Sequence, residues 1–226
     1  MSKNIVVSVI CNAFNHEPYI RAALEGFVMQ KTNFAFEVLI HDDASTDKTA
    51  EIIREYEVKY PELIKPIYQT ENQYSKDRGL VSKIQYGRMK GQYIAFCEGD
   101  DYWTDPLKLQ KQVDALEAHP EADMCAHRAQ RLQNGQCIEI FPKETESKIF
   151  SVEEVIAGDG GFVASASLMW RASMFEKHWA FRDCLKFDYT LQIQGALRGG
   201  MLYLSDCMSV YNFMNLYQPF VAVFAV

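Results

Sequence analysis

The feature that most constrains the fold is a series of short, continuously apolar segments separated by stretches with helical periodicity. Ile5–Cys11 (IVVSVIC) is apolar without alternation and rich in β-branched residues, which indicates a strand buried on both faces. Phe36–Ile40, Leu63–Tyr68 and Tyr93–Cys97 predict three further strands. Strands that alternate with helices predict an α/β fold, with a Rossmann-like, mostly parallel central sheet flanked by helices.

Helix signals occupy the intervals between these strands. Pro18 suits the first position of one helix, the polar run His41–Asp47 offers N-caps for a second, and Asp105-Pro106 opens a third. The predicted apolar faces are Ile20, Leu24 and Phe27 in the first helix, Ile52, Ile53 and Tyr56 in the second, and Leu109, Val113 and Leu116 in the third.

The second half of the chain is less regular. Ser151-x-x-Glu154 is a capping box that predicts a short helix, and a longer helix is expected over about residues 188–197. Short strands are predicted at Met124–Ala129, Cys137–Phe141, Ser167–Trp170, Met201–Leu204 and Ser209–Tyr211. Because no repeat or linker interrupts the 226 residues, we expect one domain over 1–226, with halves of about 1–120 and 121–226.

Composition excludes some classes of protein. The net charge of −7 and the lack of a Lys/Arg cluster argue against nucleic-acid binding, which needs positive charge to neutralise phosphates. The six cysteines include no C-x-x-C pair and no signal peptide precedes them, so we expect reduced thiols in a cytoplasmic protein. No segment is long and apolar enough to span a bilayer. The apolar tail Leu216–Val226 suits a buried last strand or a peripheral contact with a membrane surface.

Missing motifs narrow the class further. The chain has no G-x-x-x-x-G-K-[ST] loop, no G-x-G-x-x-G after its first strand and no G-x-S-x-G elbow. His41, His119, His127 and His178 have no zinc-site spacing and are interpreted as structural. A P-loop enzyme, a dinucleotide oxidoreductase, an α/β-hydrolase and a zinc enzyme are therefore not supported.

Polar clusters follow three of the four strands in the first half, namely Asn12–Glu17, His41–Asp47 and Glu98–Asp101. Ligands of an open parallel sheet collect at this carboxyl edge. Two of the clusters contain adjacent aspartates, which repel each other unless a cation or a ligand hydroxyl meets them, and Mg²⁺ or Mn²⁺ prefers such oxygen ligands. The alternative is that these aspartates only cap helices or lie in solvated turns. Trp103 suits either a pocket wall or the core.

The first half also resembles a known family, the inverting family 2 glycosyltransferases of the GT-A fold. The matching stretches are Val7–Asn15 (VSVICNAFN), Asp42–Thr49 (DDASTDKT), Gly91–Trp103 (GQYIAFCEGDDYW) and Asp105–Gln110 (DPLKLQ). The second half matches loosely through Asp188-Tyr189 and Met208–Tyr211. The resemblance implies a GT-A fold whose first half binds a nucleotide-sugar and whose smaller, irregular second half faces the acceptor.

The resemblance also implies roles for individual residues. Asn12 and Phe14 fall where the family lines the base and ribose, and Asp43 where a carboxylate accepts a hydrogen bond from uracil. Asp100 and Asp101 occupy the DXD-type position, so that Asp100 should lie near the ribose and Asp101 should bind the metal, Mn²⁺ or Mg²⁺.

The expected reaction follows from these assignments. Asp188 falls near the family's catalytic base, and its alternative is an N-cap of the following helix. The expected donor is a UDP-sugar, and the expected acceptor is a saccharide or lipid-linked saccharide at the inner face of the cell membrane. Lys76, Arg78 and Lys83 suit a diphosphate contact or a solvated loop.

Two departures from the family pattern leave alternatives open. Asn12 replaces the usual proline or threonine, and Tyr211 is followed by an apolar tail in place of the family's Arg and His-containing loop. One alternative is therefore a truncated or non-catalytic nucleotide-sugar binder. A second is a signalling receiver domain, but that fold has its acidic pair after the first strand, where this chain has Asn12–Glu17.

Overall fold

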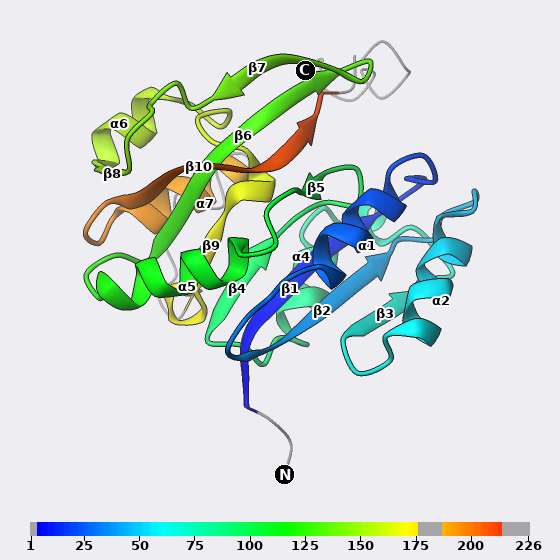
Figure 1. The fold of residues 1–226 in the computed structure, drawn as a ribbon. Helices are drawn as coiled ribbons and strands as arrows, with labels where there is room; N and C mark the ends of the chain where they lie inside the picture. Colours follow the sequence, from blue (N-terminus) through cyan, green and yellow to red (C-terminus); the bar gives the residue numbers. More distant parts are fainter. Residues whose placement is uncertain (1–3, 176–186, 214–226) are drawn as a thin grey trace.

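The computed structural model describes residues 4–175 and 187–213. In these residues a ten-stranded sheet has the order β3-β2-β1-β4-β9-β6-β10-β5, with β7 paired to β6 and β8 paired to β10 (Figure 1). The strands are β1 (Ile5–Ala13), β2 (Ala35–Asp42), β3 (Ile64–Tyr68), β4 (Tyr93–Phe96), β5 (Tyr102–Trp103), β6 (Met124–Gln133), β7 (Gln136–Phe141), β8 (Lys148–Phe150), β9 (Met169–Arg171) and β10 (Met201–Asn212). The helices are α1 (Ile20–Val28), α2 (Thr49–Lys59), α3 (Gln73–Lys76), α4 (Leu80–Tyr86), α5 (Lys108–Ala118), α6 (Val152–Ala157) and α7 (Phe187–Ala196), with the 3₁₀ turns η1 (Ser165–Ser167) and η2 (Ala172–Phe175).

The first half of the sheet is parallel, as its sequence predicts. β1 pairs in parallel with β2 and with β4, and β2 pairs in parallel with β3. In the second half, β6 and β10 are parallel, whereas β5, β7, β8 and β9 each join the sheet in antiparallel pairings. The predicted α/β class with a helix-flanked sheet is confirmed.

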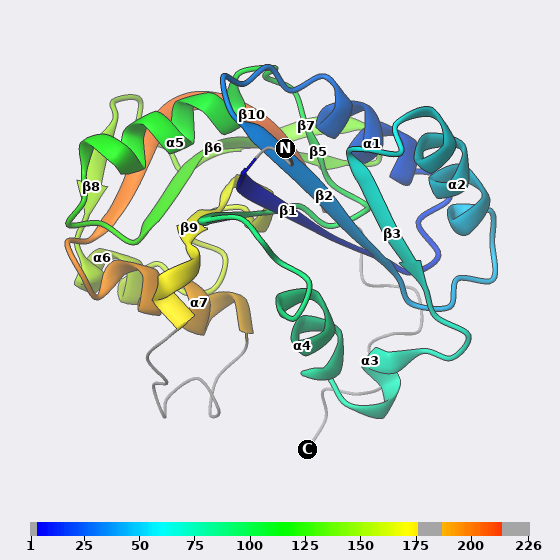
Figure 2. The ribbon, with the colours of Figure 1, turned by 90° about the horizontal axis from the view of Figure 1, so that it is seen from below.

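Helices cover both faces of the sheet (Figure 2). α1, α2 and α5 lie on one face, and α4, α6 and α7 lie on the other. β1 contributes to both cores, because Val7 and Val9 belong to the core beneath α1, α2 and α5 while Ile10 belongs to the opposite core. This explains why the β1 sequence is apolar at successive positions.

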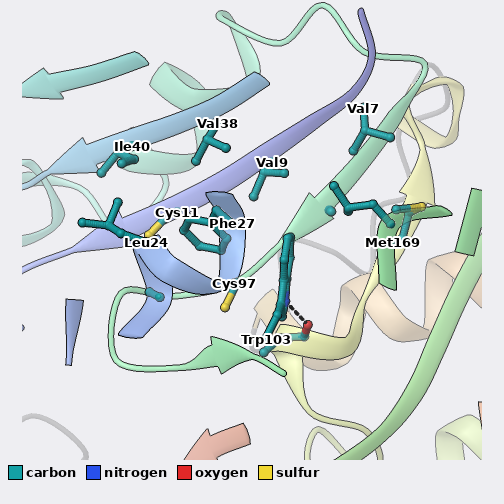
Figure 3. Close-up of a cluster of buried hydrophobic side chains, with 14 of the residues drawn as sticks. Val7, Val9, Cys11, Leu24, Phe27, Val38, Ile40, Cys97, Trp103 and Met169 are labelled. Atoms are coloured by element: carbon teal, nitrogen blue, oxygen red, sulfur yellow. Dashed lines mark hydrogen bonds between the residues drawn. The ribbon is translucent and has the colours of Figure 1, made fainter. Parts of the chain in front are cut away.

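Trp103 belongs to the core. Of the two roles that its sequence position suits, a pocket wall or a core residue, the structure shows the second. Its side chain is 2% exposed and its ring packs edge-on against Phe27, with 4.9 Å between centroids. The indole Nε1 donates a hydrogen bond of 2.9 Å to the carbonyl oxygen of Ala166 (Figure 3).

Several predicted boundaries differ from the observed ones. α1 begins at Ile20 because Pro18 lies in the preceding turn, where the His16 carbonyl accepts the Tyr19 and Ile20 amides at 2.9 and 2.8 Å. The strand predicted from Ser167 begins at Met169, after the η1 turn. The two strands predicted after residue 200 are the single strand β10, whose pairing with β6 shifts register twice.

The capping box is confirmed at α6. The Ser151 hydroxyl accepts the Glu154 amide at 3.2 Å, and the Glu154 carboxylate accepts the Ser151 amide at 2.8 Å. Within residues 4–175 and 187–213, no helix is long and apolar enough to cross a membrane. The tail Leu216–Val226 lies outside the described residues, and the division into a single domain with two halves stays a prediction.

Candidate active site

The three polar clusters meet at the carboxyl edge of β1, β2 and β4. β1 lies between the other two strands, with Asn12 in register with His41 and Ile10 in register with Phe96. Backbone hydrogen bonds of 2.9 Å then join the loops, from the Gly99 amide to the Asn12 carbonyl and from the Asp43 amide to the Ala13 carbonyl. The parallel topology therefore brings together residues that are 87 positions apart, such as Asn12 and Gly99.

An acidic loop forms the centre of this edge. Glu98, Asp100 and Asp101 follow β4, and Asp188 on α7 lies close enough to influence Glu98 electrostatically. Burial, followed by the charges of Asp100 and Asp188, raises the pKa of Glu98 to about 8. Raised pKa values among neighbouring carboxylates are typical of functional sites, and the role of these residues stays a prediction.

The two adjacent aspartates differ in their surroundings. Asp100 is half-buried, and its Oδ1 has no hydrogen-bond partner among the described residues. Asp101 is 1% exposed, and its Oδ1 accepts the backbone amide of Asn212 at 2.9 Å. Burial, followed by the neighbouring Asp100 charge, raises the pKa of Asp101. Asp100 is thus the more accessible carboxylate, and the assignment of Asp101 to the metal stays a prediction.

His16 is a polar residue of the site that sequence reasoning missed. Its Nε2 lies 4.0 Å from Asp100 Oδ2, and both side chains are 17% exposed. A Cβ on Gly99 would lie 2.8 Å from His16 Nδ1, so a side chain at that position would collide with the imidazole. His16 lies within the first polar cluster, Asn12–Glu17, and that membership was the available signal.

Asp43 is buried at 5% exposure and holds the start of α3. Its two carboxylate oxygens accept the backbone amides of Gln73 and Tyr74 at 2.7 and 3.0 Å, and His41 Nε2 lies 3.3 Å from Oδ1. Each carboxylate oxygen has two lone pairs, so these bonds leave acceptor capacity for a base. The uracil contact of Asp43 stays a prediction.

The remaining nucleotide residues lie on the β1 side of the edge. Asn12 and Phe14 are half-buried, and the Asn12 side-chain oxygen accepts Gln85 Nε2 at 3.2 Å. Asn15, at φ 54°, bridges this loop to the next through a 2.8 Å hydrogen bond from the Thr46 amide to its side-chain oxygen. The base and ribose contacts of Asn12 and Phe14 stay predictions.

Asp188 lies in the first turn of α7, one residue after the helix begins, rather than at its N-cap. It lines a pocket of about 210 Å³ whose other walls are Arg131, Phe141, Gly160, Gly161, Val163, Ala164, Ser165, Gln192, Tyr211 and Phe213. Solvent reaches the Asp188 side chain, yet the surrounding protein desolvates the carboxyl and raises its pKa. A carboxylate of this kind accepts protons more readily near neutral pH than a fully solvated one.

Two of the basic residues that the sequence offers for a diphosphate contact are exposed. Lys76 is exposed and pairs with Glu71, and Lys83 is exposed on α4. The described residues contain no group of three or more His, Cys, Asp or Glu side chains that could hold a metal ion unaided. A divalent cation at Asp100 or Asp101 would therefore need ligands from phosphate or water.

A scan against protein-family models matches residues 8–216 to "Glycosyl transferase family 2". The chain is 36% identical over 213 residues to the uncharacterized protein Rv1520 of Mycobacterium tuberculosis, covering 91% of this chain and 58% of the relative. It is 34% identical over 112 residues to the Escherichia coli UDP-Glc:alpha-D-GlcNAc-diphosphoundecaprenol beta-1,3-glucosyltransferase WfaP, covering 50% and 41% of the two chains. The chain thus spans less than two thirds of the length of these relatives.

Among solved structures, TarS 1-349 of S. aureus in complex with UDP-GlcNAc matches this fold. The TM-score is 0.69 at 19% identity, over 93% of this chain and 59% of that one. At this identity the match supports the GT-A fold alone.

Proposed function

This chain belongs to glycosyl transferase family 2, and from that premise we propose that it moves a sugar from a UDP-sugar to an acceptor hydroxyl with inversion. One observation carries the proposal. Glu98, Asp100 and Asp101 after β4 and Asp188 on α7 gather at the carboxyl edge of the sheet, although α7 is 87 positions after Asp101. A metal-assisted transfer can use acidic side chains in two roles, as ligands of the cation and as the general base.

The donor nucleotide would lie over the ends of β1 and β2. Asn12 and Phe14 flank one side of this surface, and Asp43 provides a carboxylate to accept the uracil imide proton. The fixed position of Asp43 supports this role, because two backbone amides already hold its side chain in place before a ligand arrives.

Mn²⁺ or Mg²⁺ fits the carboxylates at this site. The unpartnered Oδ1 of Asp100 is an oxygen ligand of the type that both ions prefer, and the diphosphate would supply further oxygens. Asp101 Oδ2 is likewise unpartnered among the described residues, and we assign the metal contact to Asp101, with Asp100 beside the ribose. When bound, the cation neutralises the charge that develops on the leaving diphosphate.

Asp188 is assigned as the general base. Its carboxylate takes the proton of the acceptor hydroxyl while the hydroxyl oxygen bonds to the anomeric carbon and the bond to the diphosphate breaks. Attack from the side opposite the diphosphate inverts the anomeric configuration. The raised pKa of Asp188 supports this role, provided that the carboxyl is deprotonated at the working pH.

The pocket beside Asp188 is assigned to the acceptor. Phe141, Tyr211 and Phe213 offer ring surface. Arg131 offers N–H donors and Gln192 an unpartnered side-chain oxygen that can accept, a combination suited to a saccharide. WfaP is named for a sugar carried on diphosphoundecaprenol, which supports a saccharide or lipid-linked acceptor for this chain and a role in polysaccharide or glycolipid synthesis. We propose the cytoplasmic face of the membrane as the place of this synthesis.

A thermal-shift titration tests the donor assignment. UDP, GDP and ADP are each added with and without Mn²⁺, and UDP with Mn²⁺ is expected to raise the melting temperature most. UDP-GlcNAc and UDP-glucose are then compared, and release of UDP reports turnover. Equal shifts for the three nucleotides contradict the donor assignment, whereas tight UDP-sugar binding without turnover identifies a non-catalytic binder.

A further inference from the structure

His16 is held beside the acidic loop by hydrogen bonds of its main chain. Its amide donates to the Thr49 hydroxyl at 2.8 Å, where α2 begins. Its carbonyl accepts the Tyr19 and Ile20 amides at 2.9 and 2.8 Å, where α1 begins. Because both helices fix this residue, the direction of its side chain is set before a ligand arrives.

The imidazole of His16 lies between Gly99 and Asp100. A Cβ on Gly99 would come within 2.8 Å of Nδ1, so the ring fills the space that a side chain at position 99 would need. Nδ1 is closed to solvent and has no hydrogen-bond partner among the described residues. Nε2 lies 4.0 Å from Asp100 Oδ2, and both side chains are 17% exposed, so a ligand can reach this pair.

The distance of 4.0 Å is too long for a hydrogen bond between the two side chains and suits a group that lies between them. An oxygen at about 2.8 Å from each atom fits this separation. It must donate to the Asp100 carboxylate, which only accepts, and it can accept from a neutral imidazole whose Nε2 carries the proton. A hydroxyl group meets both conditions, whereas an ionised phosphate oxygen has no proton to donate.

We propose that His16 and Asp100 hold one ribose hydroxyl of the donor nucleotide between them, so that His16 is a binding residue for the donor. The proposal rests on the donor role argued above. The position of His16 favours the ribose over the acceptor sugar, because the loop after β1 carries both His16 and Asn12, whose carbonyl accepts the Gly99 amide at 2.9 Å. Among the described residues, the lining of the pocket beside Asp188 includes neither His16 nor Asp100.

A divalent cation is the other group that an imidazole and a carboxylate can hold together. The two alternatives differ in what abolishes the contribution of His16. If His16 contacts a hydroxyl, removal of that hydroxyl from the nucleotide abolishes the contribution, and the metal is not needed. If His16 binds the cation, removal of the metal abolishes it, and the ribose hydroxyls have no influence.

Three substitutions at position 16 and one elsewhere define the test. His16→Ala removes both ring nitrogens, and His16→Phe also removes them but keeps a ring against Gly99, which protects the fold if alanine does not. His16→Gln keeps an N–H donor on a side chain of similar reach. His119→Ala is the matched control, because His119 is an exposed histidine that pairs with Glu121 before the start of β6.

The measurement is calorimetric titration of UDP, 2′-deoxy-UDP and 3′-deoxy-UDP with Mn²⁺. We expect the wild type to bind one of the two deoxy nucleotides about tenfold more weakly than UDP, because the bridging hydroxyl is missing from it. His16→Ala and His16→Phe should weaken UDP about fivefold to tenfold and leave that deoxy nucleotide within about twofold of its wild-type affinity. His16→Gln should recover most of the loss, and His119→Ala should match the wild type.

Two results overturn the ribose contact while UDP still binds. One is equal wild-type affinity for UDP and both deoxy forms. The other is a loss in His16→Ala and His16→Phe that is the same for all three nucleotides, or no loss at all.

Titration of uridine without metal, followed by NMR, addresses the cation. A ribose contact predicts that His16→Phe still weakens uridine, by about fivefold. A loss confined to UDP with Mn²⁺ makes His16 a metal ligand and overturns the proposal. A wild type that binds neither UDP nor uridine contradicts the donor role itself, and the ribose contact is rejected with it.

Discussion

The two halves of the molecule specify their parts of the site in different ways. In the donor half, residues 4–120, β1, β2 and β4 each end in a polar cluster, and their parallel pairing places the clusters side by side. In the acceptor half, residues 121–213, the same edge is built from helix α7, the end of β10 and the β6–β7 hairpin, which meet only through tertiary contacts. The local sequence pattern therefore predicts the site residues of the donor side, whereas those of the acceptor side are brought together only by tertiary packing.

The largest expected effect separates chemistry on the acceptor side from binding on the donor side. Asp188→Asn keeps the size of the side chain and removes its proton acceptor. We expect turnover of the UDP-sugar with a working acceptor to fall by about 10²–10⁴, with donor affinity within a few fold. Release of UDP measures turnover, and calorimetry measures donor binding. Turnover that survives would return Asp188 to a structural role in the first turn of α7.

The second effect concerns the core that carries the donor half. Phe27 is fully buried on α1 and packs against Trp103, which directly follows the acidic loop and Tyr102. Phe27→Ala is expected to lower the free energy of unfolding by about 3–5 kcal/mol, since it removes a buried ring and leaves a cavity.

Val58→Ala is the matched control, because Val58 lies on α2 of the same half and is 82% exposed. A change within about 0.5 kcal/mol is expected there. Urea unfolding measures both variants. A small loss for Phe27→Ala would mean that the first core repacks easily, and that the donor half is less rigid than its buried strands indicate.

The third effect concerns Lys108, a buried lysine on α5. It is fully buried on α5, its Nζ lies 3.9 Å from the centre of the Trp103 ring, and it has no hydrogen-bond acceptor within the described part of the chain. Burial lowers the pKa of Lys108 to about 7. An unfolded lysine stays protonated up to about pH 10.4, so folding becomes less favourable as the pH falls from there to about 7.

Lys108→Met removes this cost. The variant is expected to be more stable than the wild type at pH 7 by a few kcal/mol, because each unit of depressed pKa corresponds to about 1.4 kcal/mol. The difference should shrink toward pH 10, where the wild-type amine is neutral in the folded protein. Urea unfolding at both pH values measures it. A difference that does not change with pH would show that Lys108 stays charged, held by the Trp103 ring or by water.

The sequence predicted the donor half well because its signals are local. The strands and helices there follow from runs of fewer than a dozen residues, and the edge of the sheet follows from their parallel order. The errors were small and came from turns: Pro18 looked like a first helical residue, but the His16 carbonyl closes a turn before α1 begins.

The acceptor half was harder because its decisive contacts have no local signature. The hydrogen bond between Asp101 and Asn212 spans 111 positions, and nothing around Asn212 marks it in advance. β8, with three residues, is too short to show a period, as is the two-residue β5 that pairs with β10 from the donor half. The exception is the capping box at Ser151, which was predicted correctly because its two hydrogen bonds lie within four residues.

The capping box at Ser151 gives the smallest expected effect and the sharpest test of the difference between the two halves. Ser151→Ala removes the hydroxyl that accepts the Glu154 amide, and an N-cap substitution of this kind costs about 1 kcal/mol. α6 contacts α7, which carries Asp188, because the Tyr189 hydroxyl donates to the Ile156 carbonyl at 2.7 Å. The loss should therefore remain on the acceptor side, lowering the urea midpoint slightly.

Ser151→Ala should leave nucleotide binding on the donor side unchanged. The melting-temperature shift produced by UDP with Mn²⁺ is expected to match that of the wild type, since β1, β2 and the acidic loop make no hydrogen bond to α6 in the described residues. Glu154→Gln is the control, because its side-chain oxygen can still accept the Ser151 amide while the pairing with Lys148 is lost. If Ser151→Ala reduced the nucleotide-induced shift and Glu154→Gln did not, the fold of α6 would influence the donor site. The two halves would then be coupled beyond the contact between Asp101 and Asn212.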